Sequence, residues 1–452
     1  MSEVRFGRLT DAPATFNLVG ARVIDPFDGT DAVRNFAVRD GVIVREAPDG
    51  AERIDGHGLV VAPGFCDLHT HLREPGGNGS ETIESGSRAA ARGGFTTVCA
   101  MPNTDPPLDT AAAVADAAGR DVACRVRVIG AATSGRSGVA VADVAAMASA
   151  GAVGFSDDGA AVADDSLVRE LLAALAVVGL PLVEHAEDSV RGNGGVMRDG
   201  PVAARLGLAG WPSEAEISIV ERDIAFAAAA GARLHLTHLS TAGALEAVRR
   251  AKERGEKVTC DVTPHHLAMT DAWVAGSRRF AWEEPEPQDG RAYDGRCRVN
   301  PPLSSRDDAL ALLAGVADGT VDAIATDHAP HPPERKLVPF DEASPGLIGL
   351  ETALSLGLSA VDAGKLDLVT LTAALSTRPA SVIGEKRTLA AGAEADLVVF
   401  DPNAPWRVEA SVLASASANT PLLGMELPGV VRLTVAAGRV TYRSISASVQ
   451  DA

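Results

Sequence analysis

Eight short apolar segments recur along the central part of the chain, each followed by a stretch rich in alanine and leucine. Such segments are typical of buried parallel strands, and stretches such as DDSLVRELLAALAVVG have the apolar spacing of helices. Repeated strand–helix units predict an α/β fold, and eight of them predict a closed (β/α)8 TIM-like barrel, with an open doubly wound sheet as the alternative. The expected strands are GFCDLH at Gly64, FTTVCAM at Phe95, RVRVIGA at Arg125, AVGFS at Ala152, PLVEH at Pro181, RLHLTH at Arg233, KVTCDVT at Lys257 and AIATD at Ala323.

The segments before and after these units have a different pattern. Residues from about 14 to 62 read as short β segments separated by turn residues, and the C-terminal stretches ADLVVFDP and VVRLTVAAGRVTYR have the same character. Each piece alone is too short to bury a face, so we expect the two to form one small β-sandwich domain. The predicted domains are 1–62 and 391–452 for the β domain and 63–390 for the barrel.

Composition excludes several classes of function. The net charge of −19 argues against a nucleic-acid-binding surface or an anionic membrane surface. The five cysteines are scattered without a C-x-x-C pair, which indicates a reducing cytoplasm without disulfides. No signal peptide and no membrane span are expected. Because aromatic residues make up only 4% of the chain, alanine, valine and leucine must fill the core.

Residue types that bind metals stand at the ends of five of the expected strands. The C-terminal strand ends of such a barrel meet at one rim. A lone buried histidine is more often a hydrogen-bonded core residue, but four imidazoles and two carboxylates at one rim suit divalent ions, zinc first, with room for one or two. The candidate metal ligands are His69, His71, Asp158, His185, His238 and Asp327.

The stretch GFCDLHTHLREPG joins two of these ligands to a cation. If it continues as a strand, Asp67, His69, His71 and Arg73 point to one side. Burying this row without partners would cost several kcal/mol, so a metal ion with a bound acid is the expected partner. Asp67, one step deeper, is expected to hydrogen-bond a ligand histidine.

Hydrolysis of an amide-like bond is the reaction class that such a site favours. A divalent ion lowers the pKa of its bound water toward about 7 and polarises a carbonyl oxygen. A neighbouring carboxylate can take the proton and deliver it to the leaving nitrogen. Asp327, alone at the end of the last strand, is the expected general base and acid.

An ordered set of motifs carries a family resemblance. PGFCDLHTHLREPG, AMPNTDP, GFSDDG, VEHAED, LTHLST, CDVTPHHL, RVNPPL, ATDHAPH and GLIGLETAL follow one another from Pro63 to Leu354. With this set the chain resembles the amidohydrolase superfamily and, within it, the dihydroorotases of the longer bacterial type. The resemblance implies a first metal at His69, His71, Asp158 and Asp327, and a second among Asp158, His185 and His238. Related hydantoinases use a carboxylated lysine as the bridging ligand, where this chain has Asp158.

The resemblance also implies a reaction and a substrate. The reaction is the zinc-dependent, reversible cyclisation of N-carbamoyl-L-aspartate to L-dihydroorotate in de novo pyrimidine biosynthesis, with metal-bound hydroxide as the nucleophile. Arg73 offers a planar fork for the substrate carboxylate. Asn103, Asn300 and His331 are implied around it. A homodimer and association with aspartate carbamoyltransferase are both compatible with the resemblance.

Two alternatives remain open. Another cyclic amidohydrolase of the hydantoinase or allantoinase type would share the metal site, but allantoinases carry asparagine at the position of Arg73 and hydantoinases lack the VTPHHL string. A non-catalytic dihydroorotase-like partner of aspartate carbamoyltransferase would be expected to lack metal ligands, and all six are present. The polar run from about Val274 to Cys297 is predicted to be a solvated insertion.

Overall fold

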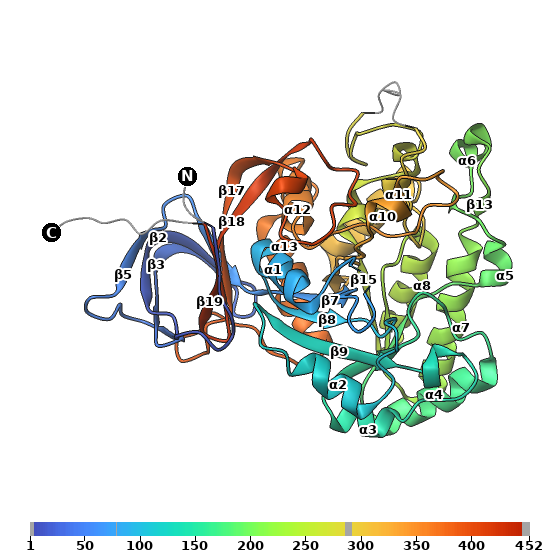
Figure 1. Ribbon diagram of the computed structural model, residues 1–452, viewed down its shortest axis with the longest axis horizontal. Coiled ribbons are helices and arrows are strands. Elements are labelled where there is room, and N and C mark those ends of the chain that lie inside the picture. The colour runs from blue at the N-terminus through green and yellow to red at the C-terminus, as the bar shows by residue number, and fades with distance from the viewer. Residues whose placement is uncertain (1–3, 78, 285–291, 445–452) are drawn as a thin grey trace.

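Two large sheets and one two-stranded sheet make up the β structure. The computed structural model describes residues 4–77, 79–284 and 292–444. Figure 1 shows the helices gathered around the central sheet, while the other large sheet lies to one side. Among the described residues, no helix is both long and apolar enough to cross a membrane.

The central sheet contains the eight predicted strands. They pair in sequence order, and each pairing is parallel. Their bounds are β7 Phe65–Thr70, β8 Phe95–Ala100, β9 Arg125–Ala131, β10 Ala152–Ser156, β11 Leu182–Glu184, β14 Leu234–Leu236, β15 Val258–Val262 and β16 Ala323–Ile324.

The sheet closes between its first and last strands. Thr70 at the end of β7 forms a parallel bridge with His328, four residues beyond β16. The backbone N–H of His71 then donates to the carbonyl of His328 at 2.9 Å. The (β/α)8 barrel is therefore confirmed, and the open doubly wound alternative is wrong.

Helices cover the outside of the barrel, and α4 illustrates the apolar face and the end signals that define such a helix. In α4, Leu167, Leu171 and Leu175 lie four residues apart and are buried, the Asp164 side chain caps the N-terminus, and Gly179 ends the helix at φ 80°. The helices are α1 Ile83–Gly93, α2 Ala111–Ala118, α3 Val144–Ser149, α4 Asp165–Val178, α5 Ser189–Gly192, α6 Pro201–Leu206, α7 Glu214–Ala230, α8 Ala242–Glu253, α9 Pro264–Ala268, α10 Arg306–Asp318, α11 Pro333–Lys336, α12 Ala353–Asp362, α13 Leu368–Leu375 and α14 Thr377–Val382.

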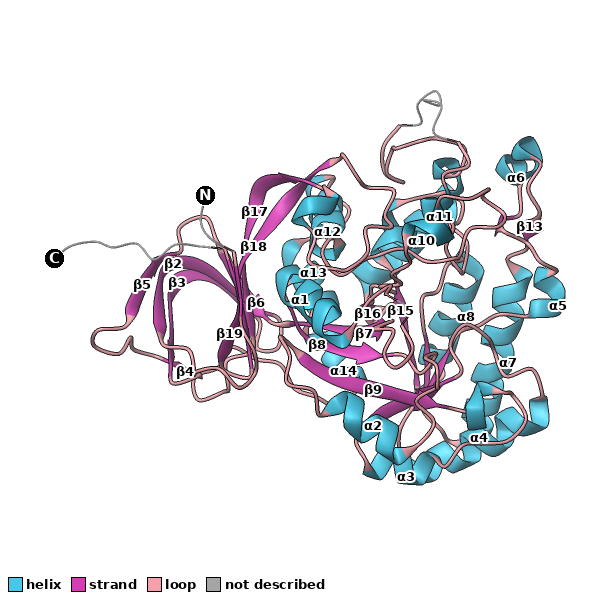
Figure 2. Cartoon of the chain, viewed as in Figure 1, coloured by secondary structure: helices cyan, strands magenta, loops and turns pink. Residues whose placement is uncertain are grey.

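The second large sheet combines the two ends of the chain, as the sequence predicts. Figure 2 shows it curling beside the barrel. β17 pairs with β18 on one side and with β6 on the other, so the C-terminal strands join the N-terminal ones. The strands are β1 Arg5–Phe6, β2 Phe16–Asp25, β3 Thr30–Arg39, β4 Val42–Val44, β5 Glu52–Asp55, β6 Val60–Pro63, β17 Leu397–Arg407, β18 Glu426–Ala436 and β19 Arg439–Arg443. The small third sheet pairs β12 Met197–Arg198 with β13 Gly210–Trp211.

The junction between the two large sheets is short. β6 ends at Pro63 and β7 begins at Phe65, so Gly64 alone separates them. A Cβ at Gly64 would lie 2.3 Å from the side chain of Thr96, so only glycine fits there. The domain boundaries at 62 and 390 stay predictions.

The predicted insertion from Val274 to Cys297 is only partly solvated. Residues 285–291 lie outside the described part of the chain. Val274 and Cys297 are buried in a hydrophobic cluster, and Phe280 stacks on Trp273 with ring centroids 6.1 Å apart. The prediction of a solvated insertion is therefore wrong for the described flanks, because their apolar residues pack under the barrel rim.

Candidate active site

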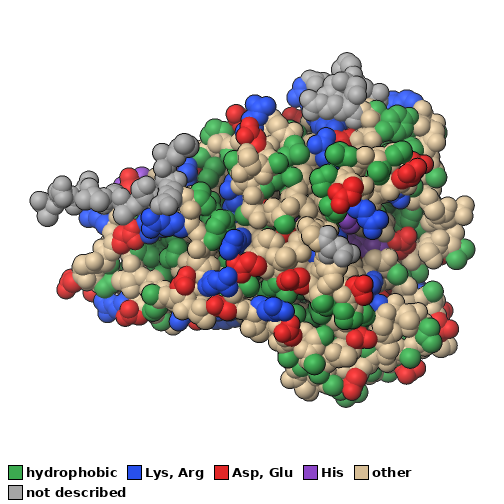
Figure 3. Space-filling view, viewed as in Figure 1, with side chains coloured by type: hydrophobic (Ala, Val, Ile, Leu, Met, Phe, Trp, Pro, Cys, Tyr) green, Lys and Arg blue, Asp and Glu red, His purple; other side chains and the backbone are tan. Residues whose placement is uncertain are grey.

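The predicted metal ligands converge at the C-terminal rim of the barrel. His69 lies in β7, while the other five follow the ends of β7, β10, β11, β14 and β16. Figure 3 shows histidine side chains at the bottom of a hollow in the molecular surface. All six of these side chains are nearly buried. Strand direction in the barrel therefore brings together residues separated by more than 250 positions.

One group of ligands surrounds the outer part of this hollow. His69, His71 and Asp158 each offer an atom within 4.8 Å of the others. The Nε2 atom of His69 lies 3.3 Å from Asp158 Oδ1, and that of His71 lies 3.6 Å from Asp158 Oδ2. Asp327 Oδ1 lies 3.1 Å from His71 Nε2 and 3.6 Å from His69 Nε2. The two imidazoles therefore share the space between two carboxylates.

A second group shares Asp158 with the first. Asp158, His185 and His238 also offer atoms within 4.8 Å of one another. Asp158 Oδ1 lies 3.5 Å from His185 Nδ1 and 3.6 Å from His238 Nε2. Asp158 consequently stands where a ligand bridging two ions would stand.

The residues present fit a divalent ion. His69 Nε2 and Asp158 Oδ1 are buried and have no hydrogen-bond partner in the described structure. Leaving such atoms unsatisfied costs free energy, whereas a metal ion between them would use both lone pairs. Imidazole nitrogens and carboxylate oxygens are ligands of borderline divalent ions, with zinc the commonest. The cluster is thus a candidate site for one or two divalent ions.

The electrostatics of the cluster follow from the close contacts of its members. Burial lowers the pKa of His69, but Asp158 and Asp327 outweigh it and raise the pKa to about 9. Burial also lowers the pKa of His185, and Asp158 with Glu187 raises it to about 10. Conversely, burial raises the pKa of Asp158 and Asp327, yet the imidazoles hold both well below the ordinary carboxyl value. A metal ion must therefore displace protons from these imidazoles when it binds.

A buried network behind the ligands sets their orientation. His69 Nδ1 lies 2.8 Å from Thr237 Oγ1, and that hydroxyl donates to Asp261 Oδ2 at 3.0 Å. Asp261 also accepts from the backbone N–H of His238 at 2.6 Å. Partners of this kind fix the ring and the tautomer of a metal ligand. The sequence pattern did not single out Thr237 and Asp261. They directly follow Leu236 of β14 and Cys260 of β15, which are paired in the barrel.

Asp67 makes the predicted hydrogen bond to a candidate ligand histidine through the backbone of His69 and not through its ring. Its Oδ1 accepts from the backbone N–H groups of His69 and Thr326, and its Oδ2 accepts from the Thr326 hydroxyl at 2.5 Å. Asp67 therefore connects β7 to the segment after β16 and does not touch the imidazole of His69. The His69 ring turns toward Thr237, directly after β14, instead.

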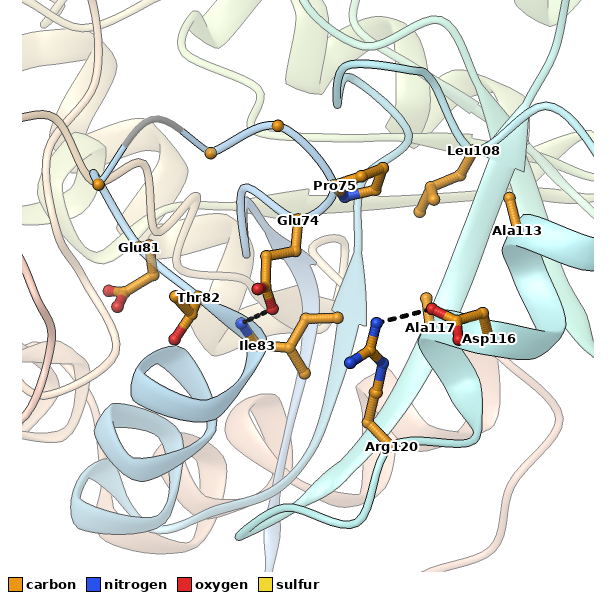
Figure 4. A pocket seen from close by; sticks show the side chains of 13 residues that line it. Glu74, Pro75, Glu81, Thr82, Ile83, Leu108, Ala113, Asp116, Ala117 and Arg120 are labelled. Atoms are coloured by element: carbon orange, nitrogen blue, oxygen red, sulfur yellow. Dashed lines mark hydrogen bonds and ion pairs between the residues drawn. The ribbon is translucent and has the colours of Figure 1, made fainter.

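Arg73 reaches the site from a loop, not from a strand. β7 ends at Thr70, and Arg73 adopts the left-handed conformation at φ 58°, so the predicted strand face does not extend to it. The following Glu74 accepts from the backbone N–H of Ile83 at 2.8 Å. Figure 4 shows Glu74 turned toward Ile83, with Pro75 over the cavity between α1 and α2. The loop is thereby tied to the start of α1.

The guanidinium of Arg73 lies beside His331. Its Nε donates to the carbonyl of Pro330 at 3.3 Å, and its Nη2 lies 3.4 Å from His331 Nε2. His331 also contacts the carbonyl of Pro345, and its backbone N–H donates to Asn419. Among the described residues no carboxylate lies within ion-pair distance of Arg73.

The two predicted asparagines lie at opposite sides of the ligand cluster. Asn103 Oδ1 is 2.8 Å from His71 Nδ1, and its Nδ2 donates to Asp158 Oδ2 at 3.1 Å. Asn300 Nδ2 donates to Glu187 Oε2 at 2.8 Å and lies 3.3 Å from His185 Nε2. Both asparagines are in direct contact with predicted ligands or their partners. Glu187, in the motif VEHAED, was not predicted to have a role.

Three residues of the site adopt strained backbone conformations. Arg73, His238 and Asp327 have φ values of 58°, 40° and 47°. A side chain at positive φ costs free energy, and such residues concentrate where function requires a particular geometry. These three residues lie in separate loops, and the loops meet at the cluster of candidate ligands.

Of the remaining histidines, His235 and His328 have polar partners, whereas both ring nitrogens of buried His265 have no hydrogen-bond partner in the described structure. The Nδ1 atom of His235 lies 2.8 Å from Thr259 Oγ1, and its Nε2 atom lies 2.8 Å from Asp261 Oδ2. His328 contacts Glu81 at 3.2 Å, away from Asp327. His265 and His266 lie beyond the end of β15 at Val262 and belong to α9. None of these is placed among the predicted ligands.

Comparison with known proteins identifies the family. Residues 58–244 match the family described as Dihydro-orotase-like, and residues 346–442 match the Amidohydrolase family. A dihydroorotase of Geobacter sp. (strain M21) is 42% identical over 94% of this chain and 98% of its own. A dihydroorotase of Anaeromyxobacter dehalogenans (strain 2CP-C) is 46% identical over 94% of this chain and 96% of its own. The chain belongs to the dihydroorotase family.

Solved structures extend the likeness to the wider superfamily. L-Hydantoinase from Arthrobacter aurescens is 26% identical, with a TM-score of 0.80 over 96% of this chain and 97% of that one. Dihydropyrimidinase from Brevibacillus agri NCHU1002 is 22% identical, with a TM-score of 0.77 over 95% of each chain, and shows the fold alone. Dihydroorotases and cyclic amidases of this type thus share one barrel architecture.

Proposed function

We propose that this chain is a metal-dependent dihydroorotase that interconverts L-dihydroorotate and N-carbamoyl-L-aspartate. Curated relatives of that name match at 42% and 46% identity over 94% of the chain. The observation that carries the substrate assignment is the guanidinium of Arg73. It lies at the rim of the metal cluster, bound by a carbonyl and an imidazole, with no carboxylate within ion-pair distance among the described residues.

Zinc is the proposed metal, with one or two ions per chain. His69, His71, Asp158 and Asp327 would hold the first ion, and Asp158, His185 and His238 would hold the second. When bound, zinc lowers the pKa of a coordinated water and polarises the carbonyl that is attacked. Thr237 and Asn103 keep the imidazoles of His69 and His71 in place, each through Nδ1, so that both Nε2 atoms face the ion.

Asp327 is the proposed general base and acid. The imidazoles around it keep its pKa well below the ordinary carboxyl value in spite of burial, so the group is ionised at neutral pH. In the hydrolytic direction it takes the proton of the attacking water and then delivers that proton to the leaving ring nitrogen. In the cyclising direction it removes the proton from the ureido nitrogen as that nitrogen bonds to the side-chain carboxyl carbon, and it returns the proton to the oxygen that leaves as water. Asp327 Oδ1 lies 3.1 Å from His71 Nε2, so the carboxylate stands beside the position where both groups would hold the ion.

Substrate recognition depends on the residues above the cluster. Arg73 would bind the carboxylate of dihydroorotate through a planar pair of N–H groups. His331 lies 3.4 Å from the same guanidinium, and Asn300 faces the cluster from the other side. Asn103 contacts His71 and Asp158 and would border the bound ring. This arrangement favours an acidic cyclic substrate over the uncharged hydantoin ring.

The test combines metal analysis with two substrates. We expect the purified protein to contain zinc and to open L-dihydroorotate much faster than hydantoin. Turnover of hydantoin alone, or full activity of a protein free of metal, would overturn the proposal.

Assembly with other chains stays a prediction. A homodimer and a complex with aspartate carbamoyltransferase can both be tested by size-exclusion chromatography with light scattering, with and without the transferase. The non-catalytic alternative is disfavoured because all six expected ligand side chains are present and gathered at one rim.

A further inference from the structure

Glu187 lies between a candidate metal ligand and a candidate substrate-binding residue. Its Oε2 is 2.9 Å from His185 Nε2 and accepts from Asn300 Nδ2 at 2.8 Å. His185 follows β11, and Asn300 comes from the segment between α9 and α10. One carboxylate oxygen therefore joins two loops of the barrel rim that are not neighbours in sequence.

The contact with His185 defines the tautomer of that imidazole. His185 presents Nδ1 to Asp158 and His238, so Nδ1 must be the unprotonated nitrogen if it binds a metal. The proton then resides on Nε2, which donates to Glu187. A carboxylate in this position orients the ring and makes the imidazole a better ligand.

The contact with Asn300 defines the orientation of an amide. Asn300 uses Nδ2 to donate to Glu187, so its Oδ1 is turned away as an acceptor. Dihydroorotate carries ring N–H groups that an amide oxygen can accept. Without Glu187 the Asn300 amide could rotate and present its N–H donors where its oxygen would otherwise accept from the substrate.

We propose that Glu187 is a positioning residue that couples occupancy of the second metal position to binding of the substrate. This inference rests on the proposed function, because it assumes that His185 binds a metal and Asn300 binds the substrate. A metal on His185 strengthens the His185–Glu187 contact and holds the carboxylate that orients Asn300. Coupling between two binding sites is reciprocal, so substrate must also tighten the second metal.

The fold offers a matched control in the next residue. Asp188 is also a partly buried carboxylate of this loop, and it caps α5 by accepting from the backbone N–H groups of Val190 and Arg191. It contacts neither His185 nor Asn300 through any hydrogen bond in the described structure. Asp188→Asn therefore perturbs the loop and leaves the proposed coupling intact.

The experiment measures metal and substrate together. Wild type, Glu187→Ala, Glu187→Gln and Asp188→Asn are dialysed against increasing zinc, the bound metal is counted, and KM for dihydroorotate is measured at each level. In wild type, filling the second position should lower KM, on the order of 10-fold. In Glu187→Ala the second zinc should bind about 10–100-fold more weakly, and KM should become independent of zinc. Glu187→Gln, whose amide oxygen can accept both hydrogen bonds but carries no charge, should lie between the two.

The outcomes separate this inference from the proposed function. Wild type that binds only one zinc, or a Glu187→Ala protein whose KM still follows zinc as in wild type, would overturn the coupling while leaving dihydroorotase activity established. An effect of Asp188→Asn equal to that of Glu187→Ala would assign both to loop stability and overturn it too. A wild-type protein without dihydroorotate turnover would instead refute the proposed function, which the zinc counts alone do not test.

Discussion

Arg73 provides the sharpest test of substrate choice, because its proposed partner is a group that can be removed from the substrate. The guanidinium has five N–H donors, and in the described structure it makes only two long contacts, 3.3 Å to Pro330 O and 3.4 Å to His331 Nε2. Most of its donors are therefore available to a carboxylate. Dihydrouracil is the same ring without the carboxylate.

The expected magnitude follows from the two hydrogen bonds that would be lost. A hydrogen bond to a charged group contributes about 1.5–3 kcal/mol, so a bidentate pair contributes roughly 3–6 kcal/mol. Because each 1.36 kcal/mol changes a rate tenfold, Arg73→Ala should lower kcat/KM for dihydroorotate by on the order of 10²- to 10⁴-fold. Arg73→Lys keeps the charge but loses the fork, and should fall between Arg73→Ala and wild type.

The assay follows kcat/KM for both substrates at fixed zinc, together with the zinc content of each variant. Arg73→Ala should leave the slow reaction of dihydrouracil within a few-fold of wild type and should retain its metal. Arg120→Ala is the control, because Arg120 is an exposed arginine whose ion pair with Asp116, 2.7 Å long, lies beside the same loop (Figure 4). Equal losses on both substrates would refute the assignment of Arg73 to the carboxylate.

Three further experiments test the cluster of candidate ligands. Asp327→Asn should lower kcat by about 10²–10⁴-fold, since it removes a proton acceptor, as steady-state kinetics would show; a loss below tenfold would contradict the role. Thr237→Val removes the partner of His69 Nδ1 and should weaken zinc binding by about 10–100-fold in equilibrium dialysis; unchanged affinity would count against it. In metal-free protein the folded pKa values of His69 and His185 are raised to about 9 and 10, so their stabilising contribution is complete below pH about 6.5 and is lost as the pH rises through 9 to 10. Thermal unfolding of the chelated protein should therefore show a melting temperature that falls over this range, and a rise would refute the sign.

The convergence of the candidate ligands could be predicted from sequence because a parallel barrel places all C-terminal strand ends on one rim. His185 and His238, for example, are far apart in the chain but follow neighbouring strands, β11 and β14. Once the strands were recognised, the rim position of each following residue was determined. The same rule could not predict what lies behind the ligands, because that depends on how each ring rotates.

The missed residues show this limit clearly. Asp67 looked like the partner of His69 by strand alternation, but the ring turns to Thr237. Arg73 lies beyond the end of β7 and has a left-handed backbone conformation, which the alternation of side chains along a strand cannot predict. Glu187 stands two residues after a predicted ligand, and only the distances identify its contacts with His185 and Asn300.

The position of Asp158 between the two groups of candidate ligands has a consequence for maturation of the active site. A carboxylated lysine, as in the related hydantoinases, must capture carbon dioxide before its site is complete. Asp158 is encoded in the gene and needs no such modification, and it belongs to both groups of candidate ligands. Protein refolded with zinc in buffer purged of carbon dioxide and bicarbonate should therefore regain full activity, and the cell's carbon dioxide supply should have no bearing on maturation of this active site.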